Sequence, residues 1–391
     1  MKVSLATQAV RHGIETDTQH GAVIPPLYLS SNYTFEDFNV KRPYDYTRSG
    51  NPTRDVLGET LAALEGGQRA VITATGMAAV TLCTHLLESE DLLVVSMDCY
   101  GGTHRLFTHL AKKGHFQVMF ADLTDPLVLG SCRIKKPRMF WVETPSNPLL
   151  RITDITAVVQ AARAVDALVV VDNTFLSPEL QQPLRLGADI VVHSTTKYIN
   201  GHSDVVGGAV VARSTELGEQ LIWWANCLGI TGSPFDSYLT LRGLRTLSAR
   251  MRIHCENAIE VANCLRRHPR VRQVYFPGFH DHVGHQVAAS QQTGFGGMVS
   301  FELEGGQADL AAFIRRLNCF SLAESLGGVE SLVAHPATMT HAAMDAGSRA
   351  LAGISDQLIR LSVGIEDPLD LTRDLNAALD APHTVYLRGV Q

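Results

Sequence analysis

Between Ala62 and Ala212 the chain alternates short apolar runs with stretches in which apolar residues recur at helical spacing. Short runs rich in Val and Ile are typical of strands buried on both faces, and the intervening stretches are typical of covering helices. The predicted strands are Ala70–Thr73, Leu92–Ser96, Phe116–Ala121, Met139–Glu143, Leu168–Val171, Ile190–Val192 and Gly207–Ala212. This alternation predicts an α/β domain built on a mainly parallel sheet.

The pattern changes on both sides of this region. Residues 1–60 carry paired prolines, many hydroxyls and the turn signal Gly50-Asn51-Pro52. Because such a segment buries itself poorly, we expect either a loose irregular arm or an arm that lies over another surface, such as that of a neighbouring subunit. After the sheet, Leu217–Gly229 and Phe235–Arg267 have helical patterns, and the second is long enough to leave the first domain.

From Val271 onward, strand and helix patterns alternate on a smaller scale. The predicted elements are the strands Met298–Leu303 and Leu358–Val363 and the helices Asp309–Leu317 and Asp370–Leu379. They indicate a smaller C-terminal α+β domain, whose last residues, 381–391, we expect to be frayed. The predicted division is an arm over residues 1–60, a large α/β domain over 61–250 and an α+β domain over 251–391.

Composition and charge narrow the function classes. The 391 residues carry a formal net charge of −6, which indicates neither a nucleic-acid partner nor a polybasic membrane surface. The seven cysteines include no CxxC pair and the sixteen histidines no HExxH motif, so we expect reduced thiols and no metal site. The amino end lacks the apolar core of a signal peptide, and no apolar run is long enough for a membrane span. We therefore expect a cytoplasmic protein.

The most informative strand end follows the apolar run Ile190–Val192. The next residues are His193, Ser194, Thr195, Thr196 and Lys197. Hydroxyls beside a lysine at the carboxyl end of a buried strand suit an anionic ligand held next to an amine, and open α/β sheets bind ligands at such ends. A desolvated lysine can lose its proton and form a Schiff base with a carbonyl. Taken alone, the same pattern is typical of an exposed loop lysine.

Three other strand ends carry groups that could contact a ligand. Gly76 and Met77 follow the first strand at the start of a helix, where free backbone N–H groups can bind an anion, although an ordinary connection fits equally. Tyr100 follows the second strand and either stacks on a flat ligand or packs against its neighbours. Asp172 follows an apolar run, so its ionisation should be costly unless a cation compensates; the alternative is a capping aspartate.

Two further segments carry polar groups of the same kind. Residues 143–148 place amide and hydroxyl groups at another strand end. Near the amino end, Tyr46 and Arg48 are spaced so that their side chains point the same way in an extended segment. A guanidinium beside a phenol suits a phosphate, but a surface pair is an equally ordinary interpretation.

Several segments resemble a known family when they are taken together and in order. They are YTRSGNPT, ATGMAA, DCYGGTHR, ETPSNPLL, VVDNTF, HSTTKYINGHSD, AESLGGVESL and LIRLSVGIED. These segments resemble the Cys/Met-metabolism pyridoxal-phosphate enzymes over nearly the whole chain. The resemblance implies the aspartate-aminotransferase-like fold (fold type I) and a homotetramer of dimers with shared active sites. Tyr46 and Arg48 would then reach the cofactor phosphate from a neighbouring subunit.

The resemblance also implies a role for each matching residue. The residues implied to hold pyridoxal 5'-phosphate are Tyr46, Arg48, Gly76, Met77, Tyr100, Asp172, Ser194, Thr196 and Lys197. The residues implied at the amino-acid substrate are Arg105, Asn147, Glu324, Ser325 and Arg360. Lys197 would carry the cofactor and shuttle protons, with Tyr100 stacked on the ring and Asp172 paired with the ring nitrogen. Arg360 would bind the substrate α-carboxylate with both guanidinium arms.

Within the family, WWAN, FDSYLTLRGLRTL and GFGGMVSFEL are most similar to the bacterial γ-synthases. The implied reaction is γ-replacement, in which L-cysteine displaces the succinyl group of O-succinyl-L-homoserine to give L-cystathionine and succinate. Glu324 matches γ-synthases and γ-lyases, and Gly102 stands where methionine γ-lyases carry a cysteine. Ser49 stands where some γ-synthases have an arginine for the succinyl carboxylate, although Arg105 could supply positive charge. Cystathionine γ-lyase and homoserine-ester sulfhydrylase are the alternatives.

Two functions of other classes are alternatives to this interpretation of the site residues. A pyridoxal-phosphate-binding protein without turnover is disfavoured, because the lysine, the ring-pairing aspartate and the carboxylate-binding arginine are all present. A Schiff-base aldolase without cofactor would need neither Asp172 nor a phosphate site. The expected partners are therefore small amino-acid substrates and other copies of the chain, without nucleic acid or membrane.

Overall fold

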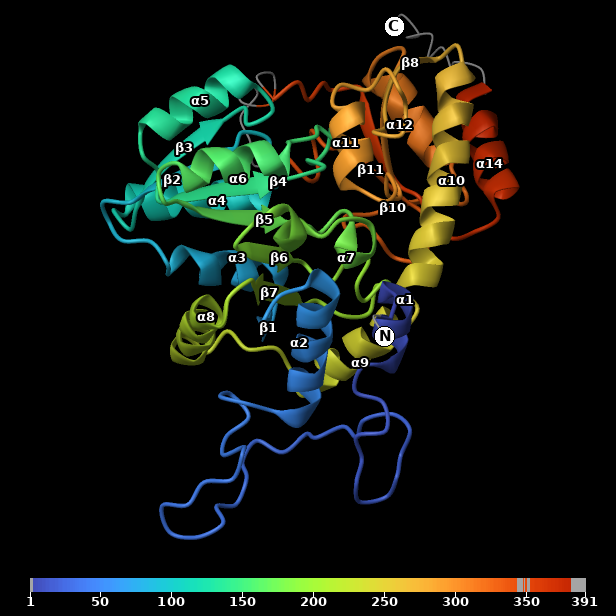
Figure 1. Cartoon of the computed structure of the whole chain (residues 1–391). Coiled ribbons are helices and arrows are strands. Elements are labelled where there is room, and N and C mark those ends of the chain that lie inside the picture. Colours follow the sequence, from blue (N-terminus) through green and yellow to red (C-terminus); the bar gives the residue numbers. More distant parts are fainter. Residues whose placement is uncertain (1–2, 343–346, 348, 350–351, 381–391) are drawn as a thin grey trace, which may run out of the picture.

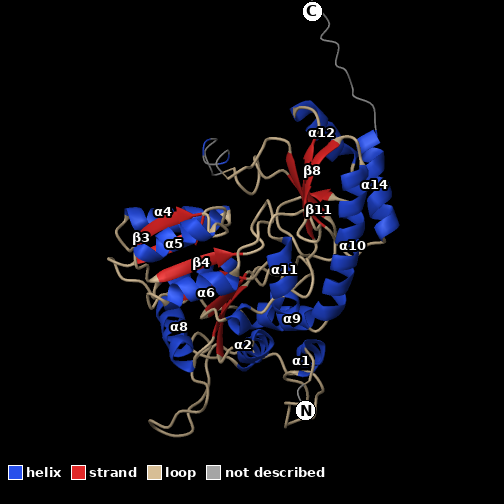
Figure 2. Cartoon of the chain, turned by 45° about the horizontal axis from the view of Figure 1, so that its top comes forward, coloured by secondary structure: helices blue, strands red, loops and turns tan. Residues whose placement is uncertain are grey.

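The computed structural model describes residues 3–342, 347, 349 and 352–380. Figure 1 shows a larger sheet with helices on both sides and, beside it, a smaller sheet. Helix α10 (Leu247–Arg267) runs from the larger domain along the smaller one. Figure 2 shows the same arrangement from a second direction, with helices around both sheets.

The larger sheet has seven strands in the order β1-β7-β6-β5-β4-β2-β3. Its strands are β1 Arg69–Thr73, β2 Leu92–Ser96, β3 Gln117–Ala121, β4 Met139–Glu143, β5 Leu168–Asp172, β6 Ile190–His193 and β7 Gly208–Ala212. Strands β2 to β6 pair in parallel, whereas β7 is antiparallel to both of its neighbours, β1 and β6. The prediction of an α/β fold with a mainly parallel sheet is confirmed.

Alternation along each strand divides the interior of this domain into two cores. In β5, Val169 and Val171 pack into one core and Val170 into the other, because successive side chains of a strand point to opposite faces. The first face is covered by α2 Pro52–Glu65, α5 Pro126–Ile134 and α6 Ile155–Arg163. The second face is covered by α3 Gly76–Thr84, α4 Gly101–Lys112 and α8 Thr215–Leu228. Each fully buried Val or Leu contributes roughly 1.5–3 kcal/mol to folding.

The smaller sheet has five strands in the order β10-β11-β12-β9-β8. Its strands are β8 Val271–Tyr275, β9 Met298–Leu303, β10 Ser321–Leu322, β11 Leu332–Ala334 and β12 Leu358–Ser362. The helices that follow α10 are α11 His285–Gln291, α12 Gln307–Arg316 and α14 Pro368–Asp380. Apolar residues of α10, α12 and α14 pack on this sheet in a third core, which is separate from the two cores of the larger sheet.

The long helical pattern over Phe235–Arg267 forms two helices, α9 (Pro234–Leu244) and α10, rather than one. At the break, the backbone N–H of Thr246 bonds to Gly243 O, and Arg250 also donates to that carbonyl over 2.9 Å. Helix α9 can end there because a side chain from α10 satisfies its terminal carbonyl. Two short elements, α7 Ser177–Leu180 and the 3-10 helix Pro183–Leu186, connect β5 to β6.

The amino-terminal segment departs from the prediction at two places. Residues 1–60 were expected to be irregular, but α1 (Leu5–Arg11) lies near their start and α2 begins at Pro52. The Asn51 side chain caps α2 by accepting hydrogen bonds from the backbone N–H groups of Thr53 and Arg54, and Pro52 suits the first helical turn. Between the two helices the chain extends away from the body of the molecule (Figure 1). The apolar side chains of this extended part are largely exposed and include Val23, Ile24, Leu29, Phe35 and Phe38.

The proposed domain boundaries at residues 60 and 250 stay predictions. The expected frayed end, residues 381–391, lies outside the described residues.

Candidate active site

The carboxyl ends of β4, β5 and β6 lie side by side in the larger sheet and meet one cavity. The cavity has a volume of about 280 Å³. Its lining consists of Thr75, Gly76, Met77, Val80, Tyr100, Thr103, Glu143, Pro145, Asn147, Asp172, Thr174, Phe175, Ser194, Thr196, Lys197, Val206, Ser325, Leu326 and Arg360. The structure therefore brings together residues from both sheets, as is usual for ligand sites at the carboxyl edge of an α/β sheet.

Lys197 follows β6 and lines this cavity. Its Nζ atom donates a hydrogen bond to Ser325 Oγ over 2.7 Å. Burial, and after it the positive charge of Arg360, lowers the pKa of Lys197 to about 8, while Glu324 acts in the opposite direction. Part of the amine is then the free base near neutral pH, which is the form that attacks a carbonyl.

Asp172 ends β5, and its register partner on β4 is Glu143. Thr174 donates to Asp172 Oδ1 through its hydroxyl over 2.5 Å and through its backbone N–H over 3.1 Å. Burial raises the pKa of Asp172, whereas the bonds from Thr174 lower it. Burial and the charge of Asp172 raise the pKa of Glu143 well above its usual range. A buried carboxyl group at Glu143 and a partly buried one at Asp172, on one face of the sheet, favour a cationic group in the cavity.

A turn whose geometry suits an anion lies at the start of α3. The hydroxyl of Thr75 accepts a hydrogen bond from Ala78 N over 2.9 Å. The N–H groups of Gly76 and Met77 are in the first turn and therefore have no acceptor within the helix. Gly76 packs so closely on Ser194 that an added Cβ would lie 2.7 Å from Ser194 Cβ. This arrangement of N–H groups beside a hydroxyl suits a phosphate.

Two further lining residues are held by defined contacts. The backbone N–H of Tyr100 donates to Glu143 Oε2 over 2.7 Å, and the side chain of Tyr100 is 44% exposed at the cavity. Gly102 lies beneath the Tyr100 ring, because a Cβ there would approach ring atom Cε1 to 2.6 Å. Thr196 Oγ1 exchanges hydrogen bonds with the backbone of Gly207 over 3.0 and 3.2 Å. Its hydroxyl is thereby oriented before any ligand binds.

Arg360 enters the cavity from β12 of the smaller sheet. It is 2% exposed, and its Nη1 and Nη2 atoms donate to Asn147 Oδ1 over 2.9 Å and to Ser325 O over 2.8 Å. Its Nε atom has no hydrogen-bond partner among the described residues. Burial lowers the pKa of Arg360 to about 10, so it stays charged at neutral pH. A buried guanidinium with an unused donor is suited to a carboxylate ligand.

The sequence profile of the family described as Cys/Met metabolism PLP-dependent enzyme matches residues 6–380. The chain belongs to this family. It is 54% identical over 371 residues to cystathionine gamma-synthase of Escherichia coli K12, covering 95% of this chain and 96% of that one. It is 46% identical over 377 residues to cystathionine gamma-lyase of Dictyostelium discoideum, covering 96% of this chain and 97% of that one.

A solved structure gives the same assignment of the fold. The crystal structure of cystathionine gamma synthase from Xanthomonas oryzae pv. oryzae, in complex with aminoacrylate and cysteine, superposes with a TM-score of 0.96. It is 63% identical, and the match covers 97% of this chain and 98% of that chain. The predicted membership of the PLP-dependent family and the predicted fold type are therefore confirmed.

The residues of the cavity fit the cofactor of this family. A free-base amine at Lys197 can bond to the aldehyde, and the acidic wall at Asp172 suits a protonated ring nitrogen. The N–H groups of Gly76 and Met77 have no acceptor within helix α3 and can donate to phosphate oxygens. The cofactor dependence expected from the sequence is thus consistent with the donor groups of the site.

Four predicted site residues lie outside this cavity. Arg105 is exposed on α4, and Glu324 is exposed just before Ser325, although its charge reaches Lys197. Tyr46 and Arg48 are in the arm, where a turn rather than an extended strand brings the Arg48 guanidinium 5.5 Å from the Tyr46 ring centre. Arg48 donates to the backbone and side chain of Asn226 over 2.8 and 2.6 Å. Within one chain these four residues do not contribute to the cavity wall.

Sequence reasoning missed four polar residues of the wall: Thr103 in α4, and Thr75, Thr174 and Glu143 at strand ends. Thr75 caps α3, Thr174 holds Asp172, and Glu143 holds the backbone of Tyr100. Each stands directly at or just beyond a strand end, so the position was a usable signal. The sequence did not indicate which of several polar residues at each end points into the cavity, because that depends on the pleat and the loop path.

Among the described residues, no three His, Cys, Asp or Glu side chains come together in a way that could hold a metal ion. In the same part of the chain, no helix has both the length and the apolar character needed to cross a membrane.

Proposed function

We propose that the chain catalyses cystathionine γ-synthesis, the replacement of the succinyl group of O-succinyl-L-homoserine by L-cysteine. The products are L-cystathionine and succinate. The proposal is supported by relatives of that name at 54% and 63% identity over nearly the whole chain. The observation that carries it is the position of the Lys197 amine, which shares one cavity with Asp172 and with the buried, charged Arg360.

Pyridoxal phosphate, when bound, supplies an electron-withdrawing ring that stabilises negative charge at carbons next to the substrate nitrogen. Lys197 would take the proton from Cα and pass it on to the cofactor, and the amine, again a free base, would then take a proton from Cβ as the γ-substituent leaves with its bonding electrons. Its lowered pKa makes the amine a base at neutral pH, and Ser325 Oγ holds it in the cavity. Asp172 would accept a hydrogen bond from the ring nitrogen and keep it protonated.

The other lining residues bind and orient. The N–H groups of Gly76 and Met77, with the hydroxyls of Ser194 and Thr196, would hold the phosphate. Tyr100 would stack on the cofactor ring, and a smaller side chain at this position would hold the ring less firmly.

At the substrate end, Arg360 would bind the α-carboxylate through its guanidinium, with Asn147 and Ser325 fixing the orientation of its two arms. Two donors in a rigid fork select a carboxylate at a fixed angle to the cofactor. Glu324, which is exposed just before the lining residue Ser325, would contact the amino-acid end of the incoming substrate or the leaving group.

Completion of the site by a second subunit is part of the proposal. Tyr46 and Arg48 lie on the exposed arm and would contact the phosphate of a neighbouring copy, in a homotetramer of dimers. The exposed apolar side chains of the arm support this, because large exposed apolar surfaces usually mark an interface. A cytoplasmic location also stays a prediction.

Cystathionine γ-lyase is the second candidate. Ser49 stands where some γ-synthases have an arginine, and Arg105 is exposed outside the cavity. Among the described residues, Arg360 is the only arginine that lines the cavity, and it is assigned to the α-carboxylate. The distal succinyl carboxylate therefore has no arginine partner within this chain's own cavity. A lyase needs no such contact. The relative from Dictyostelium discoideum, at 46% identity, carries the gamma-lyase name.

A product assay distinguishes these activities. The purified protein with pyridoxal phosphate is offered O-succinyl- or O-acetyl-L-homoserine, with and without cysteine, and in parallel cystathionine alone. The proposal predicts cystathionine as the main product of the succinyl ester with cysteine. Faster cleavage of cystathionine than its formation would instead identify a lyase. Lys197→Ala is the control: it should retain fold and phosphate binding but lose turnover with every substrate.

A further inference from the structure

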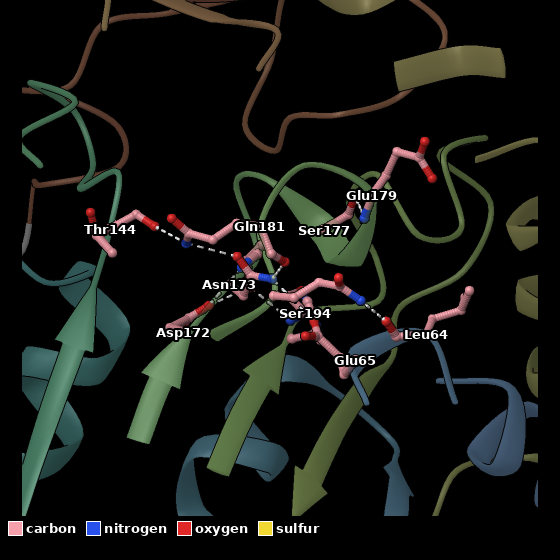
Figure 3. Close-up of polar contacts among 12 residues, drawn as sticks. Leu64, Glu65, Thr144, Asp172, Asn173, Ser177, Glu179, Gln181 and Ser194 are labelled. Carbon is pink, nitrogen blue, oxygen red and sulfur yellow. Dashed lines mark hydrogen bonds and ion pairs between the residues drawn. The ribbon is translucent and has the colours of Figure 1, made fainter. Parts of the chain in front are cut away.

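A hydrogen-bonded network lies on the face of the sheet opposite to the cavity. Glu65, at the end of α2, accepts hydrogen bonds at Oε1 from His193 Nε2 over 2.6 Å and from Asn173 Nδ2 over 3.0 Å. Gln181 Nε2 donates to Asn173 Oδ1 and to Thr144 O, each over 3.0 Å. Figure 3 shows Glu65, Asn173 and Gln181 gathered beyond the strand ends. All of these side chains are buried.

Three of the network residues are chain neighbours of residues at the cavity. Asn173 follows Asp172, His193 precedes Ser194, and Thr144 follows Glu143. Because successive residues of a strand point to opposite faces, the cavity residues and the network residues form two layers that share one backbone. The core contacts agree, since Val171 and Val191 pack on the α2 side and Val170 and Val192 on the α3 side.

The Glu65 carboxyl group and the His193 imidazole are in contact in a place without access to water, and the contact is an ion pair when His193 is protonated. Their side chains are 0% and 1% exposed. Glu65 Oε2 and His193 Nδ1 have no hydrogen-bond partner among the described residues. An ionised carboxylate is costly in such a place unless a cation faces it, and His193 is the group in contact that can supply the charge.

We propose that Glu65 holds His193 as a cation behind Asp172, and that this charge keeps Asp172 ionised so that the cofactor ring nitrogen retains its proton. Glu65 and His193 are thus positioning residues that act through Asp172. The inference rests on the proposed function, because it needs a pyridine nitrogen at Asp172.

The electrostatics of the cavity wall make such a charge useful. Burial raises the pKa of Asp172; the bonds from Thr174 and the charge of His193 lower it. The other titratable groups that interact with Asp172 are Glu143 on β4, Cys83 on α3 and Cys99 after β2. None of these three groups can carry a positive charge, whereas His193 can, so His193 is the group that can compensate the negative charge of Asp172.

The direction of the effect follows from this arrangement. If Glu65 is neutral, His193 loses its counter-ion and releases its proton. Asp172 then becomes a stronger base, and the proton it shares with the ring nitrogen moves toward the carboxylate. The ring withdraws electrons less well, so kcat should fall while KM changes little.

The test uses the holoenzyme with ¹⁵N-labelled pyridoxal phosphate, whose ring-nitrogen chemical shift reports protonation without turnover. Glu65→Gln keeps the size and one acceptor but removes the charge. We expect about a tenfold fall in the ratio of protonated to unprotonated ring nitrogen, since one pKa unit is a tenfold change. Gln181→Leu is the matched control, because it removes hydrogen bonds from the same network without changing its charge. It should lower the melting temperature but leave the ring-nitrogen signal at its wild-type position.

A wild-type ring-nitrogen signal in folded Glu65→Gln holoenzyme overturns the inference. So does an equal shift in Gln181→Leu, which would mean that the hydrogen bonds alone set the geometry. If Glu65→Gln does not fold, ¹⁵N-histidine spectra of the wild-type holoenzyme decide, with His193→Gln used to assign the signal. A doubly protonated His193 supports the inference, and a neutral one refutes it. A protein that binds no pyridoxal phosphate, seen first by its absorbance, refutes the proposed function as well.

Discussion

Replacing Arg360 by lysine tests how the cavity recognises a substrate. The change keeps one positive charge but removes the planar fork, which in the structure donates to Asn147 Oδ1 over 2.9 Å and to Ser325 O over 2.8 Å. A lysine ammonium at this buried position can reach a carboxylate with a single strong hydrogen bond. It cannot also keep both of these partners satisfied.

The size of the effect follows from the bonds lost. A hydrogen bond between charged partners contributes about 1.5–3 kcal/mol, and one of the two arms toward the substrate carboxylate is lost. A loss of about 2 kcal/mol corresponds to roughly a 30-fold fall in kcat/KM. Because the α-carboxylate does not react, most of the loss should be in KM for the homoserine ester, with kcat changing by about threefold or less.

Steady-state kinetics with the homoserine ester at saturating cysteine measure the effect, and cofactor absorbance confirms that the site is loaded. Arg270→Lys is the matched control. Arg270 also lies in the smaller domain and donates to Leu379 O and Asp309, but it is not part of the cavity wall. It should lower stability without altering KM. An unchanged KM in Arg360→Lys, or a loss confined to kcat, would contradict the carboxylate contact.

Three further predictions concern the cofactor site. The rate at which the cofactor-free protein takes up pyridoxal phosphate should rise with pH through about 8, because the pKa of Lys197 is lowered from 10.5 and only the free base reacts; a stopped-flow midpoint near 10.5 would contradict this. Gly76→Ala should weaken cofactor binding at least about tenfold, because the added Cβ would lie 2.7 Å from Ser194 Cβ. Gly130→Ala in α5 is the control and should not alter binding, because the added atom there meets nothing within 4 Å. Equal cofactor dissociation constants for the two variants would exclude steric crowding at Gly76. Arg48→Ala and Lys197→Ala should each be inactive alone but regain activity when unfolded together and refolded as mixed oligomers; mixtures that stay inactive would show that the arm does not act across subunits.

The local sequence was sufficient where one physical rule dominated. Buried strands such as Met139–Glu143 consist of apolar residues on both faces, so their pattern alone predicted β4 with its observed bounds. The break between α9 and α10 could not be read in the same way. It depends on Arg250 reaching back to Gly243 O, a contact that forms only when the two helices are packed. Helix α2 was not predicted, because its cap, Asn51, was interpreted only as part of a turn.

The candidate site shows the same division. Lys197, Asp172 and Tyr100 were found because each follows a strand, and parallel strands carry their ends to one edge of the sheet. The sequence by itself therefore determined the fold, the family and the edge of the sheet at which the candidate cavity lies. The tertiary structure decided which side chains share the cavity: Arg360 joins from another sheet, Arg105 stays outside, and Glu65 reaches His193 behind the strands. These contacts join residues far apart in the chain, so no local pattern contains them, and only packing brings them within the few ångströms over which they act.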